Sequence, residues 1–250
     1  GTTTVVESTP TRDHTERMLS FAGVEVARSA RGVSVQGPAG PEPRSWIVPG
    51  DISAAMFFVV GASIVAGSDL TVSDVGLNPT RTKALEVLEA MGADIEIAES
   101  LQSAEAEPVG SVRVRASALH GLELGPDVVP AIIDELPAIA VAATQAEGVT
   151  VVTGAGELRV KESDRIDALT SGLRILGALV ETSRDGFAIS GPTPLVGGEV
   201  DPRRDHRMAM AFAIAGLVAG GKVRVRDWSS AEVSFPGFAD VLASTQARRV

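Results

Sequence analysis

The sequence contains an internal repeat, and this repeat limits its fold more than any other feature. Each copy runs from an Ala-rich apolar helix through a glycine to a strand rich in β-branched residues. In the first two copies a second amphipathic helix and a further strand follow, and in the third a second helix follows. The chain opens with the same order of strand, helix, glycine and strand, but without a preceding helix. The copies occupy residues 53–97, 134–182 and 205–244, and the opening segment occupies residues 1–26.

This regular alternation of helices and strands predicts an α/β fold built from repeated units. The apolar helices have little polar face, so we expect them to be buried between sheets. Residues 38–49 are dense in proline and glycine and form the best candidate for a linker. We therefore place a domain boundary near Val48, between residues 1–48 and residues 49–250. Because the first unit lacks its leading helix and the chain starts with Gly1, we expect it to be part of a longer gene product.

Composition excludes several classes of protein. The net charge is -10 and the isoelectric point is about 4.8, whereas a protein that binds nucleic-acid phosphates normally carries a basic surplus. The sequence has no cysteine, which excludes disulfides, thiolate metal sites and a cysteine nucleophile. No apolar run reaches the ~20 residues that a membrane span requires, and no signal peptide opens the chain. We expect a globular, cytoplasmic protein with no nucleic-acid or membrane partner.

Arginines stand at the predicted starts of four helices: Arg12, Arg81, Arg165 and Arg207. The amino end of a helix carries a partial positive charge, so a cation there costs ~0.3 kcal/mol or more. Each arginine alone could be a solvated side chain whose acidic neighbours cap the helix, as the capping-box spacing of Asp13 and Glu16 suggests. If the repeats stack in similar orientation, the helix starts instead converge on one cleft, in which amides and guanidinium groups bind polyanions.

Acidic residues accompany these cations. Lys161 and Arg165 are four residues apart, and they share one helix face if the helix extends back that far. Glu162, between them, is either an ordinary salt-bridge partner or part of the cleft. Asp134 and Glu135 open an apolar helix. Either both acids cap this helix and interact with its dipole, or the one that projects into the cleft serves as a general base.

Two other signals do not support a site. Residues 149–160 place a G-x-G after a strand, but Arg159 stands where a dinucleotide fingerprint has its third glycine. The histidines His14, His120 and His206 are too scattered in the sequence for a recognisable metal set, although His206 lies beside the last of the arginines. We therefore expect neither a nucleotide site nor a metal site.

Five stretches along the chain resemble the 5-enolpyruvylshikimate-3-phosphate synthase family: TRDHTERML, NPTRTKALEVLEAMGADI, LRVKESDR, DHRMAMAF and SFPGF. The resemblance extends over nearly the whole chain. It implies two similar domains, each of three βαβαββ units, which is the inverse α/β barrel of the enolpyruvyl transferases (the EPT/RTPC-like fold). It also implies transfer of the enolpyruvyl group of phosphoenolpyruvate to the 5-hydroxyl of shikimate 3-phosphate. That reaction releases phosphate through a tetrahedral intermediate and uses no metal or organic cofactor.

The resemblance assigns a role to each candidate residue. It implies that Asp134 contacts the shikimate hydroxyls and accepts a proton, and that Glu162 is the second catalytic acid and base, near the methylene of phosphoenolpyruvate. The implied substrate-binding residues are Arg12 on the shikimate-phosphate side, Lys161 close to the proton acceptor, Arg165 and Arg207 on phosphoenolpyruvate, and His206 in support.

The chain departs from the family pattern in two respects. Many members have a lysine just before the Ser/Thr-Phe-Pro turn, where this chain has Val233. The family's amino-terminal lysine, arginine and serine-glutamine stretch have no counterpart. Residues 1–48 would then be the carboxy-terminal piece of the shikimate-3-phosphate domain, and residues 49–250 most of the phosphoenolpyruvate domain. The chain alone would be nearly inactive, and the rest of the enzyme would be its partner. The alternatives are a UDP-N-acetylglucosamine enolpyruvyl transferase and a non-catalytic anion-binding module.

Overall fold

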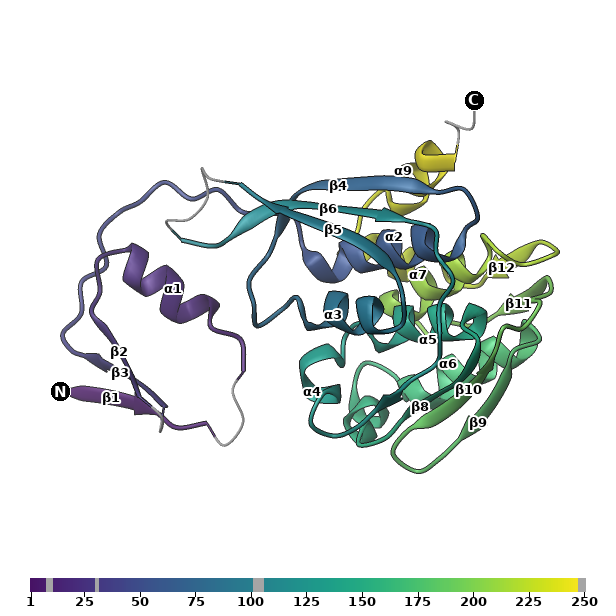
Figure 1. Cartoon of the computed structure of the whole chain (residues 1–250). Coiled ribbons are helices and arrows are strands. Elements are labelled where there is room, and N and C mark those ends of the chain that lie inside the picture. The colour runs from purple at the N-terminus through teal and green to yellow at the C-terminus, as the bar shows by residue number, and fades with distance from the viewer. Residues whose placement is uncertain (8–10, 30–31, 101–105, 247–250) are drawn as a thin grey trace.

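The computed structural model describes residues 1–7, 11–29, 32–100 and 106–246. Its most regular part is a βαβαββ unit in the second half of the chain (Figure 1). The elements of this unit are β7 (Glu123–Leu124), α4 (Val129–Ile132), α5 (Leu136–Gln145), β8 (Gly148–Val152), η1 (Gly156–Val160), α6 (Arg165–Ile175), β9 (Leu179–Thr182) and β10 (Phe187–Gly191). The strands pair in the order β7-β8-β10-β9, with β7 and β8 parallel and the other neighbours antiparallel.

The preceding unit has the same plan. Its elements are α2 (Ile52–Ile64), β4 (Asp69–Gly76), α3 (Lys83–Ala90), β5 (Asp94–Glu99) and β6 (Val109–Arg115). The strand order β4-β6-β5 matches β8-β10-β9, and all neighbours are antiparallel. In place of β7, a single parallel bridge joins Gly50 to Val75. The repeat read from the sequence is therefore a repeat of structure.

A third unit follows, and within the described residues it is shorter. It contains β11 (Gly198–Val200), α7 (His206–Ala215), β12 (Val223–Val225), α8 (Ser229–Ser234) and α9 (Phe238–Gln246). Strands β11 and β12 pair in parallel, as β7 and β8 do. The predicted second helix of this repeat is present as α9.

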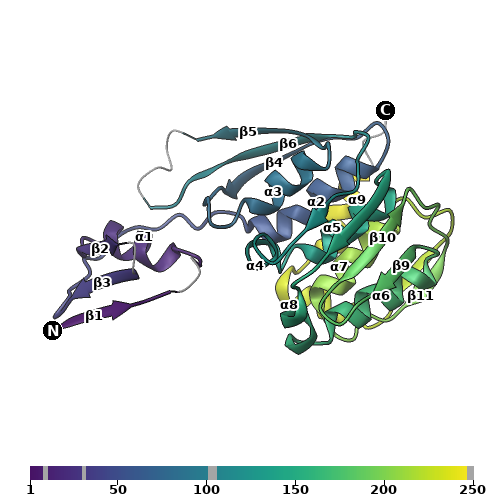
Figure 2. The same cartoon turned by 60° about the horizontal axis from the view of Figure 1, so that its bottom comes forward.

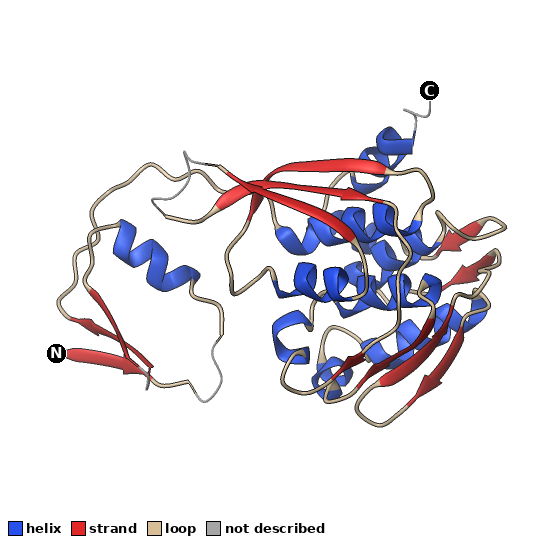
Figure 3. Ribbon diagram, viewed as in Figure 1, coloured by secondary structure: helices blue, strands red, loops and turns tan. Residues whose placement is uncertain are grey.

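The first residues form the closing half of such a unit. The elements are β1 (Thr2–Val5), α1 (His14–Phe21), β2 (Val26–Ser29) and β3 (Gly32–Gln36). They pair in the order β1-β3-β2, again antiparallel and again with the last strand in the middle. Figure 3 shows this small sheet and its helix standing apart from the other units.

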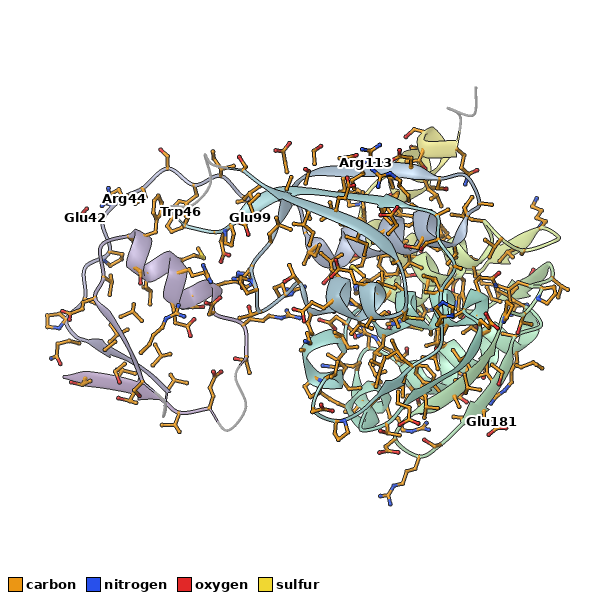
Figure 4. All side chains as sticks on the ribbon, viewed as in Figure 1. Glu42, Arg44, Trp46, Glu99, Arg113 and Glu181 are labelled. Atoms are coloured by element: carbon orange, nitrogen blue, oxygen red, sulfur yellow. The ribbon has the colours of Figure 1, made fainter. Side chains whose placement is uncertain are left out.

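Residues 37–49, which connect the first unit to the others, contain no helix or strand. Figure 4 labels three of their side chains, Glu42, Arg44 and Trp46. Arg44 Nη2 lies 2.7 Å from Glu42 Oε2, and the Trp46 ring meets the Phe21 ring edge to face with centroids 4.9 Å apart. The segment thus packs against α1. The domain boundary placed near its end stays a prediction.

The core lies between α2, α5 and α7, which pack against one another with the sheets outside them (Figure 2). Because these helices are apolar on nearly all sides, burying them supplies much of the driving force for folding. The prediction that they are buried is confirmed. Helix α6 approaches α7 closely at Gly172, where an added Cβ would lie 2.2 Å from Cζ of Phe212. No described helix is long and apolar enough to span a membrane.

Candidate active site

Asp134, at the junction of α4 and α5, is surrounded by three guanidinium groups. Arg12 Nη2 lies 2.6 Å from its Oδ2, Arg207 Nη2 lies 3.5 Å from the same oxygen, and Arg165 Nη1 lies 3.5 Å from Oδ1. Arg207 Nη1 also donates to the Asp134 backbone carbonyl at 3.0 Å. The three arginines stand at or beside the starts of α1, α6 and α7. The helix starts therefore converge, as the repeat predicts.

Arg165 is the most buried of these arginines, with 2% of its side chain exposed. Its Nε donates at 2.7 Å to Oδ2 of Asp205, which is fully buried, and its Nη2 donates at 2.6 Å to Glu162 Oε2. The other oxygen of Asp205 accepts from the Arg207 amide at 2.9 Å and so caps α7. A single carboxylate thus fixes the starts of α6 and α7 relative to each other.

The condition under which Lys161 and Arg165 would share a helix face is not met. Helix α6 begins at Arg165, because the side chain of Asp164 accepts from the Asp167 amide and caps the helix there. Lys161 lies outside this helix, directly after the 3-10 turn η1, and its ammonium group pairs with Glu157. The structure therefore brings Arg12, Arg165 and Arg207 to Asp134 but leaves Lys161 with another partner.

The fourth arginine, Arg81, contacts Glu135, which follows Asp134 in the sequence. Its Nη2 lies 3.7 Å from Glu135 Oε1 and donates to the Ser53 hydroxyl, which in turn donates to the same Glu135 oxygen. Glu135 and Ser53 are 3% and 2% exposed. Glu135 is the N-cap residue of α5 but makes no side-chain cap bond, so of the two alternatives left open for this acid, capping by its side chain does not hold. Its carboxylate instead ties α5 to α2 and to the turn before α3.

The predicted capping box of Asp13 and Glu16 is also absent, since Asp13 makes no side-chain cap bond to α1. Its carboxylate accepts from Arg17 Nε at 2.9 Å, from Asn78 Nδ2 at 2.8 Å and from Arg28 Nη1 at 3.2 Å. Burial alone would raise the pKa of Asp13, but these three donors outweigh it and lower the pKa to about 2. Asp13 therefore makes tertiary contacts instead of capping α1.

The two adjacent acids of the site have opposite pKa shifts. Burial raises the pKa of Asp134, but the charges of Arg207, Arg12 and Arg165 outweigh it, so that its pKa is lowered. Burial dominates at Glu135 and raises its pKa, although the Ser53 hydrogen bond opposes the shift. Asp134 is thus the stronger acid of the two, and it loses its proton at a lower pH than Glu135 does.

His206, the first residue of α7, is half-buried. Burial lowers its pKa, and the charge of Arg207 lowers it further. The uncharged form of the ring is therefore favoured, which suits the supporting role that the resemblance implies.

We refer to four arginines and four acids as the arginine cluster: Arg12, Arg81, Arg165, Arg207, Asp134, Glu135, Glu162 and Asp205. Their formal charges balance, so internal carboxylates already neutralise the cations at the helix starts. Such a cluster can bind an external anion by exchange, because guanidinium groups can turn from a protein carboxylate to a phosphate or carboxylate of a ligand. In the described part of the chain, no group of three or more His, Cys, Asp or Glu residues could hold a metal ion.

Two residues of the site, Ser53 and Asp205, are not among those predicted from the sequence. Asp205 has a local signal, because an aspartate just before an apolar helix is typical of an N-cap. Ser53 has none, since it meets Glu135 across 82 positions of sequence. Its role depends on how α2 and α5 pack.

Comparison with known proteins identifies the family. A family model described as EPSP synthase (3-phosphoshikimate 1-carboxyvinyltransferase) matches residues 1–242. A 3-phosphoshikimate 1-carboxyvinyltransferase of Sphingopyxis alaskensis is 49% identical, with 98% of this chain and 57% of the relative covered. One of Nitrosococcus oceani is 50% identical, with 96% and 54% covered. The chain thus spans about half the length of the curated relatives that it matches.

Solved structures agree with the fold expected from the sequence. An EPSP synthase from Acinetobacter baumannii is 42% identical with a TM-score of 0.92, and 98% of this chain and 57% of that chain are covered. The enolpyruvyl transferase NikO from Streptomyces tendae has a TM-score of 0.78 at 16% identity, which supports the fold alone, with 98% and 56% covered. The α/β fold of repeated units predicted from the sequence and the enolpyruvyl transferase fold implied by the resemblance are confirmed, and the UDP-N-acetylglucosamine alternative is not favoured. The chain belongs to the EPSP synthase family.

Proposed function

We propose that the full-length protein containing this chain is a 3-phosphoshikimate 1-carboxyvinyltransferase. It would transfer the enolpyruvyl group of phosphoenolpyruvate to the 5-hydroxyl of shikimate 3-phosphate, in the cytoplasm. One observation carries the proposal: in a chain of the EPSP synthase family, arginines from three helix starts meet at Asp134. Both substrates carry a phosphate and a carboxylate, which are the groups that guanidinium binds best.

The proposed reaction has an addition step and an elimination step. In the addition, the hydroxyl oxygen bonds to C2 of phosphoenolpyruvate and Asp134 takes the hydroxyl proton, while Glu162, which would take up a proton when substrate anions draw Arg165 away from it, gives that proton to C3. In the elimination, the bond from C2 to the phosphate oxygen breaks, Glu162 takes a proton back from C3, and the double bond forms again. The proton on Asp134 passes to the departing phosphate. Both acids then return to their starting states.

The surroundings of Asp134 suit a proton acceptor that switches on when substrate arrives. Without substrate, its arginine neighbours lower its pKa, so it is ionised and ready to accept a proton. Substrate anions would draw Arg12, Arg165 and Arg207 toward themselves. The carboxylate would then lose part of its stabilisation, and its pKa would rise. Substrate binding would therefore make Asp134 a stronger base at the moment when a base is needed.

The remaining roles follow the family resemblance. Arg12 would bind on the shikimate-phosphate side, and Arg165 and Arg207 would hold phosphoenolpyruvate. The Lys161 ammonium group would leave Glu157 and bind substrate instead, and His206 would support the site. This scheme requires no metal and no organic cofactor.

Val233 bears on phosphate binding. It is 84% exposed in α8 and stands where many family members have a lysine. A valine provides no charge, so we expect the arginines to carry more of the phosphate binding in this protein.

A phosphate-release assay on the full-length protein tests the proposal. We expect release when both shikimate 3-phosphate and phosphoenolpyruvate are present, and none when either is omitted. UDP-N-acetylglucosamine should not replace shikimate 3-phosphate, and release with it alone as acceptor would favour the rival transferase. The 250-residue chain by itself should be nearly inactive, because it spans only 54–57% of the two curated relatives. Binding of phosphoenolpyruvate without turnover in the full-length protein would favour an anion-binding module.

A further inference from the structure

Two pairs of adjacent residues face each other across the gap between the first unit and the others. Arg12 and Asp134 form a direct ion pair of 2.6 Å. Their neighbours, Asp13 and Glu135, both contact the same short turn, residues 78–81. Residues 12–13 are therefore linked to residues 134–135 twice, once by the direct ion pair and once through this turn.

One end of the turn holds the first unit. Asn78 Nδ2 donates to Asp13 Oδ1 at 2.8 Å and to Glu107 Oε2 at 2.9 Å. The other Glu107 oxygen lies 2.6 Å from Nδ1 of His14, the first residue of α1. Asn78 is 2% exposed, and Asp13 is 9% exposed. These contacts fix the start of α1, where Arg12 stands.

The other end of the turn holds the start of α5. Arg81 lies 3.7 Å from Glu135 Oε1 and bonds to Ser53, which itself bonds to that oxygen. The side chain of Arg81 is 14% exposed. These contacts fix the backbone beside Asp134.

The turn between the two ends is itself stiff. Asn78 Oδ1 accepts from the Thr80 amide at 2.9 Å and from the Thr80 hydroxyl at 2.7 Å. The Arg81 amide donates to the Asn78 carbonyl at 2.8 Å, and Pro79 limits the backbone between them. A displacement at one end must therefore appear at the other.

We propose that Asn78 and Arg81 are positioning residues, which hold the first unit where Arg12 reaches Asp134. The proposal rests on the proposed function in one respect: shikimate 3-phosphate would bind to a site in which the contacts of Asn78 and Arg81 have already positioned Arg12. Loss of Asn78 should then weaken binding of that substrate and leave binding of phosphoenolpyruvate nearly unchanged.

The informative variant is Asn78→Asp in the full-length protein. Aspartate keeps the acceptor oxygen that the turn needs, but it replaces the Nδ2 donor with a carboxylate oxygen that faces Asp13 and Glu107. The matched control is Gln36→Glu, the same amide-to-carboxylate change at the exposed last position of β3 in the first unit. We expect Asn78→Asp to weaken shikimate 3-phosphate binding about tenfold by calorimetry, and the control to have little effect.

A double-mutant cycle with Arg12→Ala separates positioning from general stability. If Asn78 acts by placing Arg12, then Asn78→Asp should cost little in the Arg12→Ala background. Additive losses, or equal loss of affinity for both substrates, would overturn the proposal.

A distance measurement tests the same idea without substrates. Spin labels on cysteines introduced at the exposed positions Ser20 and Glu89, with any other cysteine replaced, report the separation of α1 and α3. Asn78→Asp should shift or broaden this distance, and Gln36→Glu should not. An unchanged distance would refute the positioning role. If the full-length protein binds no shikimate 3-phosphate, the proposed function fails, and the distance alone decides this inference.

Discussion

Asp205 accepts a hydrogen bond from Arg165 Nε at 2.7 Å, and both side chains are almost completely buried. The pair joins the starts of α6 and α7, and each helix then presents an arginine to Asp134. A buried ion pair is worth little compared with an apolar replacement, but removing one partner leaves an uncompensated charge.

Asp205→Asn is therefore expected to lower the free energy of unfolding by about 2–3 kcal/mol. Asparagine can still cap α7 through its oxygen, but its amide would face the Arg165 guanidinium. Urea denaturation measures the change. Glu181→Gln, at an exposed carboxylate on β9, serves as the control and should change stability by less than about 0.5 kcal/mol. A similar small change at Asp205 would mean that the buried pair contributes little.

The contribution of Asp13 should depend on pH. Its pKa is lowered to about 2 in the folded protein, so its stabilisation is complete above the unfolded value of 3.8 and is lost as the pH falls toward 2. At neutral pH this amounts to about 2 kcal/mol. The stability difference between the wild type and Asp13→Asn should accordingly shrink between about pH 5 and pH 2. A pH-independent difference would contradict the role assigned to its three donors.

Gly172→Ala should destabilise the protein by about 1–3 kcal/mol, because its Cβ would lie 2.2 Å from Phe212 Cζ. Thermal or urea unfolding would show the loss, and Phe212→Leu in the same molecule should recover part of it. Gly156→Ala is the control, since its Cβ would meet Asp185 Cβ only at 3.6 Å. If both alanines are equally tolerated, α6 and α7 are less tightly packed than the structure indicates.

Arg204→Gly should stabilise the protein by roughly 0.5–1 kcal/mol. Arg203 and Arg204 have φ of 53° and 59°, a region in which glycine avoids the steric cost of a side chain. They occupy the middle of a tight turn that is closed by the Asp205 amide and the Pro202 carbonyl. The same change at Arg184, which has no positive φ, should instead lower stability. An equal effect at both positions would rule out backbone strain as the cause.

Asp134→Asn in the full-length enzyme should lower turnover by about 10²–10⁴-fold if the acid accepts a proton, with much smaller effects on substrate binding. Steady-state turnover with both substrates, together with equilibrium binding of each, separates the two effects. Asp127→Asn is an exposed control near the start of α4. Normal turnover of Asp134→Asn would remove the residue from the proton-transfer step.

The repeat made the fold predictable because helix and strand periodicity, glycine stops and apolar helices are local signals. The convergence of Arg12, Arg165 and Arg207 was also predictable, because copies of one unit that stack alike bring their helix starts together. The resemblance then indicated the family, which the family model confirms.

The local chemistry around the site was harder to predict. Asp13 has the spacing of a cap, yet Arg17, Arg28 and Asn78 compete for its oxygens with the helix amides. Lys161 is four residues before Arg165, but Asp164 starts the helix after it. Each outcome depends on tertiary partners that are distant in sequence, and spacing alone carries no information on them.

Arg12, Arg81 and Arg165 occupy equivalent places, because each stands at or just before the helix that precedes the closing antiparallel strands of its unit. An ancestral unit with one cation at that place would, by duplication alone, have supplied three positive groups facing a common centre. Divergence then needed to change only their carboxylate partners. A polyvalent site for anions could thus arise from gene duplication before any individual contact was refined.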